Sequence, residues 1–462
     1  MERIHRKICY IFIVTMLLSN ILQSQTWTNH HSMIAYTGFG TDATAQKIKV
    51  FNQDTLIGIT KKAGVEHYGF SMFQNGNNTE YIALLDSTDI VISDFTLLGD
   101  TAYFCGKRLT SQNTYIGVIG RFSVRDFVNT TTLNCQITDI NNTEHLIGLV
   151  AFYKPSSNLV HLIAIGNDNI LSSNPGRIVY IDFQNNSNSI SSYLVFFTQQ
   201  LTIGKEIMQD ICLSNHYISV VSLVYPSNTY IIRTFERSNP NTMLSSNVFA
   251  FSNNVYFNVA SDPFMFPIHI TSFAGDKLAI CLSATDGQNF FTMVNFGSSN
   301  SPNIAYTQTI PHNDKANSPL EMDYSQEMGK ILILNEYDFR WQGANHSLCY
   351  IDPTLNTPYT TIEDSLTSVN QLNHFCILPH KKYAVVGVRS TSQMLAPHLY
   401  AIKEIASGST NCIDENSITI GNLNLPNGNS VSNLLPNPYT NLNWSSISTT
   451  SYLNGINASC AD

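Results

Sequence analysis

The amino-acid sequence predicts an all-β fold, a β-propeller of six or seven four-stranded antiparallel blades. The first observation is a repeat: an apolar run, a tight turn and a second apolar run follow one another in DFTLLGDTAYFCGK, residues 94–107, and recur along the chain. The second is composition, because polar turn residues are abundant and 22 Tyr and 25 Phe greatly outnumber 3 Trp. The third is that no segment after residue 24 has a convincing helical pattern.

The best second copy of this unit is HITSFAGDKLAICLS, residues 269–283. Its Gly-Asp pair at 275–276 matches the pair at 99–100, and in both copies a cysteine follows the Asp by five residues. Looser copies begin at Thr138, Gln209, Met322 and Asn373, which makes six, and KIKVFNQDTLIGIT at residues 47–60 can belong to a seventh. Recurrence at roughly 45 to 70 residues is close to the spacing of propeller blades.

Each copy continues with a polar hairpin and a third apolar strand: YIGVIGRFSV, RIVYIDF, TYIIRTFE, FFTMVNF, SLCYIDP and HLYAIKE. A variable polar stretch then leaves room for a fourth strand. Continuous apolar runs such as ILIL and YAVVGV indicate sheets covered on both faces, as in radially packed blades. The competing folds are a β-sandwich array and a β-helix. No linker divides the chain before about residue 405, and a β-helix needs shorter repeats, so we expect one ring over residues 30–405.

The repeat units have the form D-x-x-x-x-G-D-x-x-Y-F-C-G, imperfectly kept, and their third strands end in G-x-F or Y-I-D. In this arrangement the chain resembles a group of uncharacterised secreted β-propeller proteins of Bacteroidetes-type bacteria. The resemblance covers roughly residues 30 to 405. It implies the fold and an exported location, and it implies no catalytic residues.

Residues 1–24 have the layout of a secretory signal peptide. MERIHRK carries positive charge, ICYIFIVTMLLSNIL is apolar, and QSQ is polar. The competing interpretation is an uncleaved membrane anchor. No later segment is long and apolar enough to span a bilayer. We therefore expect a secreted, periplasmic or cell-surface protein with no membrane span after signal cleavage.

Residues 406–462 form a polar segment rich in Ser, Asn and Thr, which can close the ring by adding a strand to the first blade and then trail off along the surface. Cys412 and Cys460 in this segment are the first choice for a disulfide, because a poorly packed segment gains most from one. Cys105 and Cys281 occupy the same column of different blades. They are expected not to bond, since a disulfide needs Cα atoms within about 7 Å.

Charge and motifs exclude several classes of function. Charged residues make up 12% of a chain of net charge −9, without the basic patch that a nucleic-acid-binding protein needs. No GxSxG, HExxH or P-loop motif occurs, and the histidines are dispersed, so we expect no catalytic motif, no metal site and no cofactor. Glu321 and Asp323 flank the start of a blade, where we expect them to lie on a solvated turn, because most carboxylates are exposed; a channel-lining role is the alternative.

The loop NEYDFRWQGANHS, residues 335–347, is the candidate binding surface. It combines Tyr337, Arg340 and Trp341, and aromatic and Arg side chains are favoured at recognition sites. An indole also stacks on sugar faces. The alternative is that the aromatic residues pack against the next blade.

The sequence thus predicts a secreted, non-catalytic binding module with an unknown protein or glycan partner. A glycan-active hydrolase or lyase, with carboxylates or a Tyr in the central channel, is the alternative, and a structural cell-surface component is the second alternative. Three or more carboxylates converging on the channel mouth would favour an enzyme. A channel filled by apolar side chains would favour binding or structure.

Overall fold

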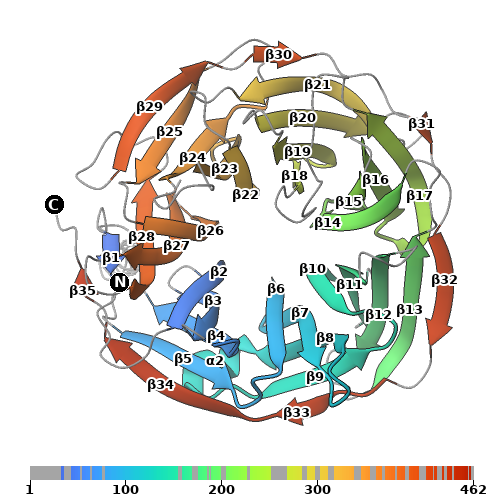
Figure 1. The fold of residues 1–462 in the computed structure, drawn as a ribbon, viewed down its shortest axis with the longest axis vertical. Coiled ribbons are helices and arrows are strands. Elements are labelled where there is room, and N and C mark those ends of the chain that lie inside the picture. Colours follow the sequence, from blue (N-terminus) through green and yellow to red (C-terminus); the bar gives the residue numbers. More distant parts are fainter. Residues whose placement is uncertain are drawn as a thin grey trace, which may run out of the picture.

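The computed structural model describes the chain in segments. They are residues 33–35, 43–52, 55–62, 65–74, 79–154, 159–168, 175–184, 187, 189–198, 204–225, 229–250, 268–283, 289–296, 302–310, 317–337, 345–353, 360–366, 370–379, 382–390, 395–404, 413–419, 421–423, 429–430, 434–439, 442–455 and 457–458. Within these segments the strands form seven antiparallel sheets of five strands each, arranged as the blades of a ring (Figure 1). The predicted all-β propeller is confirmed, with seven blades rather than six.

The inner strands surround the axis of the ring, and the blades are numbered 1 to 7 in the chain order of these strands. In chain order they are β2 (Ala43–Asn52), β6 (Ile90–Leu98), β10 (His145–Tyr153), β14 (Lys205–Leu213), β18 (Ile268–Phe273), β22 (Asn317–Ser325) and β26 (Asn370–Leu378). Each inner strand contacts that of the next blade, and β26 contacts β2, so the circle is closed.

The second strands complete the repeat that is visible in the sequence. They are β3 (Thr55–Lys62), β7 (Thr101–Leu109), β11 (Leu159–Asn167), β15 (Tyr217–Tyr225), β19 (Lys277–Ser283), β23 (Lys330–Tyr337) and β27 (Lys382–Ser390). The stretch at residues 94–107 is therefore an inner strand, a turn and a second strand. Gly99 and Gly275 take φ of 57° and 95° at this turn, a left-handed region in which glycine has no Cβ penalty.

The third and fourth strands build each blade outward. The third strands are β4 (Tyr68–Gln74), β8 (Tyr115–Ser123), β12 (Gly176–Gln184), β16 (Thr229–Glu236), β20 (Asn289–Phe296), β24 (Asn345–Ile351) and β28 (Leu395–Glu404). The fourth strands are β5 (Thr79–Leu85), β9 (Cys135–Ile140), β13 (Ile190–Thr198), β17 (Asn239–Ala250), β21 (Pro302–Ile310), β25 (Thr360–Leu366) and β1 (Met33–Ala35). The seventh copy of the repeat, at residues 47–60, belongs to blade 1.

A fifth, outermost strand in every blade comes from the C-terminal segment, which we call the belt (Figure 1, red). From blade 6 backwards to blade 1, and then to blade 7, its strands are β29 (Ile413–Thr419), β30 (Gly421–Leu423), β31 (Asn429–Ser430), β32 (Leu434–Tyr439), β33 (Ser445–Ile447), β34 (Thr449–Gly455) and β35 (Asn457–Ala458). The expectation that this segment adds one strand to the first blade is corrected: in its described part it adds one to each blade.

Blade 7 closes the ring with both ends of the chain. β1 pairs with β28 on one side and with β35 on the other, so the first and last strands lie in one sheet. The belt runs against the order of the blades, which brings its end to the strand that begins the ring. Closure therefore depends on hydrogen bonds between segments more than 400 residues apart, as in the pair Ile34–Ala458.

The hydrophobic core is divided among the interfaces between blades. One cluster joins Phe70 of blade 1 to Phe95 and Phe122 of blade 2, with the ring centroids of Phe70 and Phe122 4.5 Å apart. Other clusters join blades 2 and 3, 3 and 4, 5 and 6, and 7 and 1. Blades 1, 2 and 3 thus bury both faces against their neighbours, which explains why their strands read as continuous apolar runs.

One short helix departs from the sequence expectation of no helix. α2 (Val124–Thr130) follows β8, and the Ser123 Oγ accepts the Asp126 backbone N–H at 3.1 Å as its N-cap. Val124 and Phe127 are buried under it. In the described part of the chain no helix combines the length and hydropathy needed to cross a bilayer.

Candidate functional site

The inner strands share one irregularity at the same step. Six of them shift register by one residue, between Ala45/Lys47, Ile92/Asp94, Leu146/Gly148, Met208/Asp210, Pro319/Glu321 and Leu372/His374. Such a bulge re-aims the side chain that follows it. The residue after each shift, with His269 at the matching step of β18, forms what we call the channel ring: Lys47, Asp94, Gly148, Asp210, His269, Glu321 and His374.

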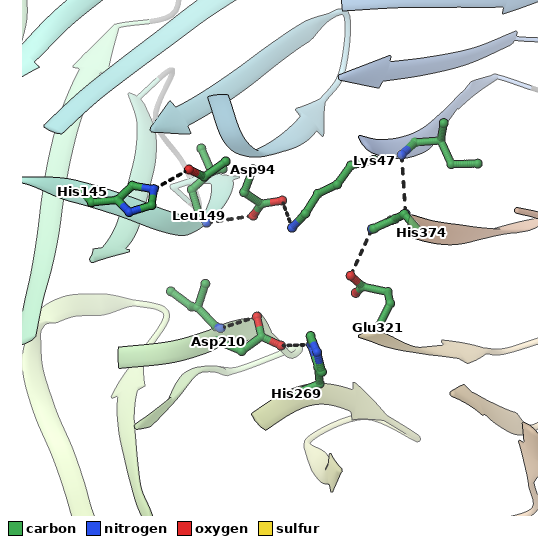
Figure 2. Close-up of polar contacts among 11 residues, drawn as sticks. Lys47, Asp94, His145, Leu149, Asp210, His269, Glu321 and His374 are labelled. Carbon is green, nitrogen blue, oxygen red and sulfur yellow. Dashed lines mark hydrogen bonds and ion pairs between the residues drawn. The ribbon is translucent and has the colours of Figure 1, made fainter. Parts of the chain in front are cut away.

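The channel ring faces the axis because the next residue of every inner strand faces the blade. Those next residues are apolar and between 0% and 7% exposed: Ile48, Phe95, Leu149, Ile211, Ile270, Met322 and Phe375. Successive side chains of a strand point to opposite faces. Figure 2 shows ring side chains from several blades around a central opening. The ring side chains that pair with one another are 7% to 28% exposed, so solvent reaches them.

Lys47 and Asp94 join blades 1, 2 and 3. The Lys47 Nζ lies 3.0 Å from the Asp94 Oδ1, and the Asp94 Oδ2 accepts the Leu149 backbone N–H at 3.1 Å. Burial alone would lower the pKa of Lys47, but the negative charge of Asp94, and then that of Glu321, outweighs burial and raises it. Lys47 therefore carries a fixed positive charge.

Asp210 and His269 make the matching contact between blades 4 and 5. The Asp210 Oδ2 accepts the Ile270 backbone N–H at 2.9 Å and lies 3.5 Å from the His269 Nδ1. Burial alone would lower the pKa of His269, but its hydrogen bond to Asp210 and the charge of that carboxylate outweigh burial and raise it. As the pH falls, His269 is thus the first histidine of the channel ring to become protonated.

Glu321 and His374 join blades 6, 7 and 1. The His374 Nε2 lies 3.1 Å from the Glu321 Oε2, and the His374 Nδ1 accepts the Ile48 backbone N–H at 3.4 Å (Figure 2). An Nδ1 that accepts a hydrogen bond carries no proton, so Nε2–H donates to Glu321, and burial lowers the pKa of His374. Burial would raise the pKa of Glu321, but His374 and Lys47 outweigh it and hold that pKa far below its ordinary value.

These contacts repeat one arrangement around the ring. A channel-ring side chain accepts the backbone N–H of the residue after the ring position in the next blade, in the pairs Asp94–Leu149, Asp210–Ile270 and His374–Ile48. Each contact gives a backbone N–H of one blade a side-chain acceptor on the blade before it. The channel ring therefore fixes neighbouring blades to one another while it presents charge to the opening.

Two residues further along the strands, Lys49 of blade 1 and Asp323 of blade 6 form a second level. The Lys49 Nζ lies 5.9 Å from the centroid of the Phe95 ring. Asp323 is solvent-exposed, and its Oδ1 accepts the Tyr324 backbone N–H at 2.7 Å. Its side chain reaches solvent, but its place inside the ring removes part of the water around it, and this desolvation, with the charge of Glu321, raises the pKa of Asp323 to about 6.

Glu321 and Asp323 were the carboxylates that the sequence pattern singled out. Both lie within β22, with the tight turn at residues 326–329 beyond its end, so the interpretation as a solvated turn is wrong. Alternation places both side chains on the channel side of the strand, with Met322 buried between them. Asp94, Asp210 and Glu321 put three carboxylates on the channel side of the inner strands, midway along them rather than at the mouth that the criterion above names.

The predicted binding loop is described only at its edge. Tyr337 ends β23 in blade 6, where it pairs with Asn317 and Asn345. Arg340 and Trp341 lie outside the described residues, and the binding role of the three stays a prediction. Cys412 and Cys460 also lie outside them, so their disulfide stays a prediction as well.

The two matched cysteines confirm the alignment of the repeats. Cys105 on β7 is opposite Asp94, and Cys281 on β19 is opposite His269, so each follows a channel-ring residue in the same way. They belong to blades 2 and 5, which are not neighbours. Burial raises the pKa of the Cys105 thiol far above its ordinary value, which makes it a poor nucleophile.

Sequence reasoning missed Lys47, Asp94, Asp210, His269 and His374 as a group. The signal was present in the repeat itself, since six of the seven copies have a polar residue directly before a large apolar one: KI, DF, DI, HI, EM and HF. Among the described residues no three His, Cys, Asp or Glu side chains are grouped closely enough to hold a metal ion.

Comparisons with known proteins give likeness of fold alone. No protein-family model and no curated protein matches the chain. Among solved structures, a mutant of the NanB sialidase from Streptococcus pneumoniae is 8% identical, with a TM-score of 0.37 over 81% of this chain and 95% of that chain. The intramolecular trans-sialidase from Ruminococcus gnavus is 10% identical, with a TM-score of 0.31 over 81% and 97%.

A GH32 beta-fructofuranosidase from Bombyx mori is 8% identical, with a TM-score of 0.29 over 92% of this chain and 97% of that chain. At such identities no residue of these enzymes can be matched to a residue of this chain. The fold assignment rests on the sheet topology of this chain, which is an all-β propeller with a charged central channel.

Proposed function

We propose that the protein is a glycan-active hydrolase whose reaction site is the channel around Glu321 and Asp323. The observation that carries the proposal is this pair of carboxyl groups on one strand, both facing the channel, with pKa values moved in opposite directions. Glycoside hydrolysis needs two carboxyl groups in different protonation states on either side of one bond.

The environments of the two groups assign their roles. Glu321 is ionised, because His374 donates to it and Lys47 lies nearby, and an ionised carboxylate serves as nucleophile or as base for water. Asp323 has a pKa of about 6, which lets it hold a proton near neutral pH and donate it to the leaving oxygen. His374 orients Glu321, and the Ile48 N–H fixes the tautomer that does so.

The test is hydrolysis of a broad panel of oligosaccharides and polysaccharides, followed by release of reducing ends. We expect Glu321→Gln and Asp323→Asn each to lower kcat by about 100-fold or more, the range for loss of a catalytic acid or base. We expect wild-type rates to fall as pH rises above about 6, where Asp323 loses its proton. Glu66→Gln, on an exposed turn, is the matched control and should leave rates unchanged.

A second candidate, a non-catalytic glycan-binding or protein-binding module, is favoured by the hydrogen bonds that tie Asp94 and Asp210 to the next blade. Those carboxylates serve the architecture. Binding without turnover of any panel member, unchanged in affinity by Asp323→Asn, would support this candidate and exclude the hydrolase.

We also propose that the protein acts outside the cytoplasm, on the strength of the signal-peptide pattern of residues 1–24. Expression of the full chain in a bacterial host should release a mature form whose N-terminal sequence begins near residue 25. Full-length protein that stays in the membrane fraction would instead indicate an uncleaved anchor.

A further inference from the structure

A serine and a histidine lie in contact between blades 2 and 3, outside the channel ring. The Ser93 Oγ is 2.7 Å from the His145 Nε2, which is within hydrogen-bond range. Both side chains are half-buried, so solvent reaches the pair. Figure 2 shows His145 on the side of the opening that carries Asp94, with Glu321 on the other side. The proposed hydrolase mechanism uses neither Ser93 nor His145.

The backbone holds these two side chains in place. Ser93 is the extra residue of the bulge in β6, directly before Asp94. The Asp94 carboxylate accepts the Leu149 N–H at 3.1 Å, and Leu149 lies on β10, the strand that begins with His145. The contact that ties β6 to β10 therefore also fixes the position of Ser93 relative to His145. Reactive side chains need such support from rigid elements.

His145 is an uncharged ring near neutral pH. Burial, and then the charge of Lys107, lowers its pKa to about 4. A neutral imidazole has one nitrogen without a proton, and that nitrogen can accept the proton of a hydroxyl group. A serine within hydrogen-bond reach of such a nitrogen is the arrangement that activates a serine nucleophile.

A positive charge lies on the same face of the sheet as Ser93. Lys107 on β7 is opposite Val91, which is two positions before Ser93, so alternation turns both polar side chains toward blade 3. The effect of Lys107 on the pKa of His145 agrees with this placement. The Lys107 Nζ lies 4.2 Å from the centroid of the Tyr115 ring. An ammonium group in this place can stabilise an oxyanion that forms at Ser93.

We propose that Ser93 and His145 form a second reaction site, which hydrolyses short-chain carboxylic esters. Ser93 is the nucleophile, His145 is the general base and then the general acid, and Lys107 faces the oxyanion. Because the pair is half-buried between two blades, acetyl groups fit it better than long acyl chains. The proposal goes beyond the glycan hydrolase and does not depend on Glu321 or Asp323.

The reaction starts from the tautomer that has its proton on the His145 Nδ1. The Ser93 Oγ forms a bond to the acyl carbon while its proton passes to the Nε2, and the carbonyl oxygen becomes an oxyanion. The ester C–O bond then breaks, and the Nε2 returns the proton to the oxygen of the leaving alcohol. Water attacks the acyl-serine in the same way, which releases the carboxylic acid and restores the Ser93 hydroxyl.

The low pKa of His145 sets the expected selectivity among esters. A ring with this pKa is a weak base, so esters of acidic alcohols such as phenols should react faster than alkyl esters. The negative charge of the oxyanion favours the protonated ring, which partly offsets the effect of burial as the reaction proceeds.

The first experiment is covalent labelling of the full chain with a fluorophosphonate, in which an activated serine oxygen bonds to phosphorus and fluoride leaves. Mass spectrometry should find the label on Ser93 of the wild-type protein and none at this position in Ser93→Ala. His145→Gln should be labelled about 100-fold more slowly, the range for loss of a general base. Ser192→Ala removes an exposed hydroxyl beside Asp182 and is the matched control, with labelling of Ser93 unchanged.

The second experiment is hydrolysis of p-nitrophenyl acetate and p-nitrophenyl octanoate, with the acetate expected to react faster. Ser93→Ala should abolish the enzymatic rate, and Lys107→Gln should lower the rate with the acetate about tenfold or more. Thermal unfolding checks that each variant is folded. If His145→Gln is not folded, the labelling rate of Lys107→Gln takes its place.

Labelling of Ser93 that slows in the folded His145→Gln or Lys107→Gln variant supports the proposal. Wild-type protein that takes up no label at Ser93, or that hydrolyses p-nitrophenyl acetate no faster than Ser93→Ala, overturns it. Labelling of Ser93 at the wild-type rate in both the histidine and the lysine variant also overturns it, because this pair would then not activate the hydroxyl. No glycan is used in these experiments, so their failure leaves the hydrolase proposal intact.

Discussion

The channel ring and the belt join the same blades at opposite edges of each sheet, and they do so by different chemistry. The channel ring uses individual side chains, in which a charge on one blade meets a charge or a backbone N–H on the next. The belt uses the backbone, as where β34 pairs with β5 over seven residues. Backbone hydrogen bonds between strands form with almost any residue types, whereas side-chain pairs need particular residues at particular positions. A polar, repetitive tail can therefore serve as the belt, while chemistry is confined to side chains near the channel.

The belt is anchored by a few apolar side chains that reach into the interfaces between blades. Trp444 is 7% exposed, with its ring 5.4 Å from that of Phe183 and its face 4.7 Å from the Arg121 guanidinium. Leu434 and Ile447 pack against the clusters of blades 3 and 4 and of blades 1 and 2. The belt thus combines unspecific pairing with specific anchors.

The largest effect is expected at the main anchor of the belt. Trp444→Ala should lower the free energy of unfolding by about 3–5 kcal/mol, because it removes a buried aromatic side chain and leaves a cavity. Glycan binding and turnover in the folded variant should not change. Denaturant unfolding measures the loss, with the exposed Ser446→Ala on β33 as control. Loss of less than 1 kcal/mol would mean that the backbone ladder alone holds the belt.

The next effect concerns the channel ring as a connector of blades. Asp94→Ala leaves the Leu149 N–H and the Lys47 ammonium without their partner, and should cost about 2–3 kcal/mol of stability. Asp94→Asn keeps an acceptor for the N–H and should cost clearly less. Equal losses in the two variants would show that the charge, and not the hydrogen bond, is what matters. Thermal unfolding of both variants at one pH makes the comparison.

A third prediction asks whether the ligand extends from the channel to the loop of blade 6. Trp341→Ala should weaken glycan binding by about 2 kcal/mol if the indole is an anchor, and leave the melting temperature nearly unchanged. If the indole packs against a neighbouring blade, stability falls by about 3–5 kcal/mol instead. Affinity and melting temperature measured on one preparation separate the two, and an unchanged affinity in a well-folded variant removes the loop from the site.

The smallest effect is a difference in pH dependence between two residues of one strand. The folded pKa of Asp323 is raised, so its contribution to stability is present below about pH 4 and is lost as pH rises through about 6. The free energy of unfolding of Asp323→Asn should therefore exceed that of wild type at pH 7.5 and equal it near pH 3.5. The difference at pH 7.5 should be less than about 1 kcal/mol, because water in the channel screens the group.

Glu321 should show the opposite sign. Its folded pKa is lowered, so its contribution is present above about pH 4.5 and is lost only in strong acid. Glu321→Gln should be less stable than wild type at pH 7.5, and the difference should shrink on acidification. Melting temperatures of the two variants from pH 3.5 to 7.5 test both signs, and parallel curves would contradict the assignment of distinct protonation states.

The sequence predicted the blade but not how blades are joined. Apolar runs and the Gly-Asp turn are local, so residues 94–107 suffice to predict β6, its turn and β7. The belt strands β30, β31 and β35 have two or three residues each in polar surroundings, too short for any alternation to show. They are strands only because the edge of a blade is beside them.

The candidate site could be predicted only in part, for a related reason. Glu321 and Asp323 stood out because they are two acidic residues separated by one position at a blade start, while Lys47, Asp94 and His374 looked like isolated polar residues. No local sequence feature indicates that Lys47 contacts Asp94, 47 positions away, or that the Ile48 N–H beside it donates to His374. Six equivalent polar positions in the repeats were the available signal, and they become meaningful once the copies are known to form a ring.

The sequence by itself determined the strand pattern, the repeat and the glycine turns, because these depend on the conformational preferences of a few consecutive residues. Only the tertiary structure decided that the repeats close, that β1 and β35 share blade 7, and that six ionisable side chains surround one opening. Closure brings together residues that are hundreds of positions apart, and the charges then set one another's pKa values through distances that exist only in the folded ring.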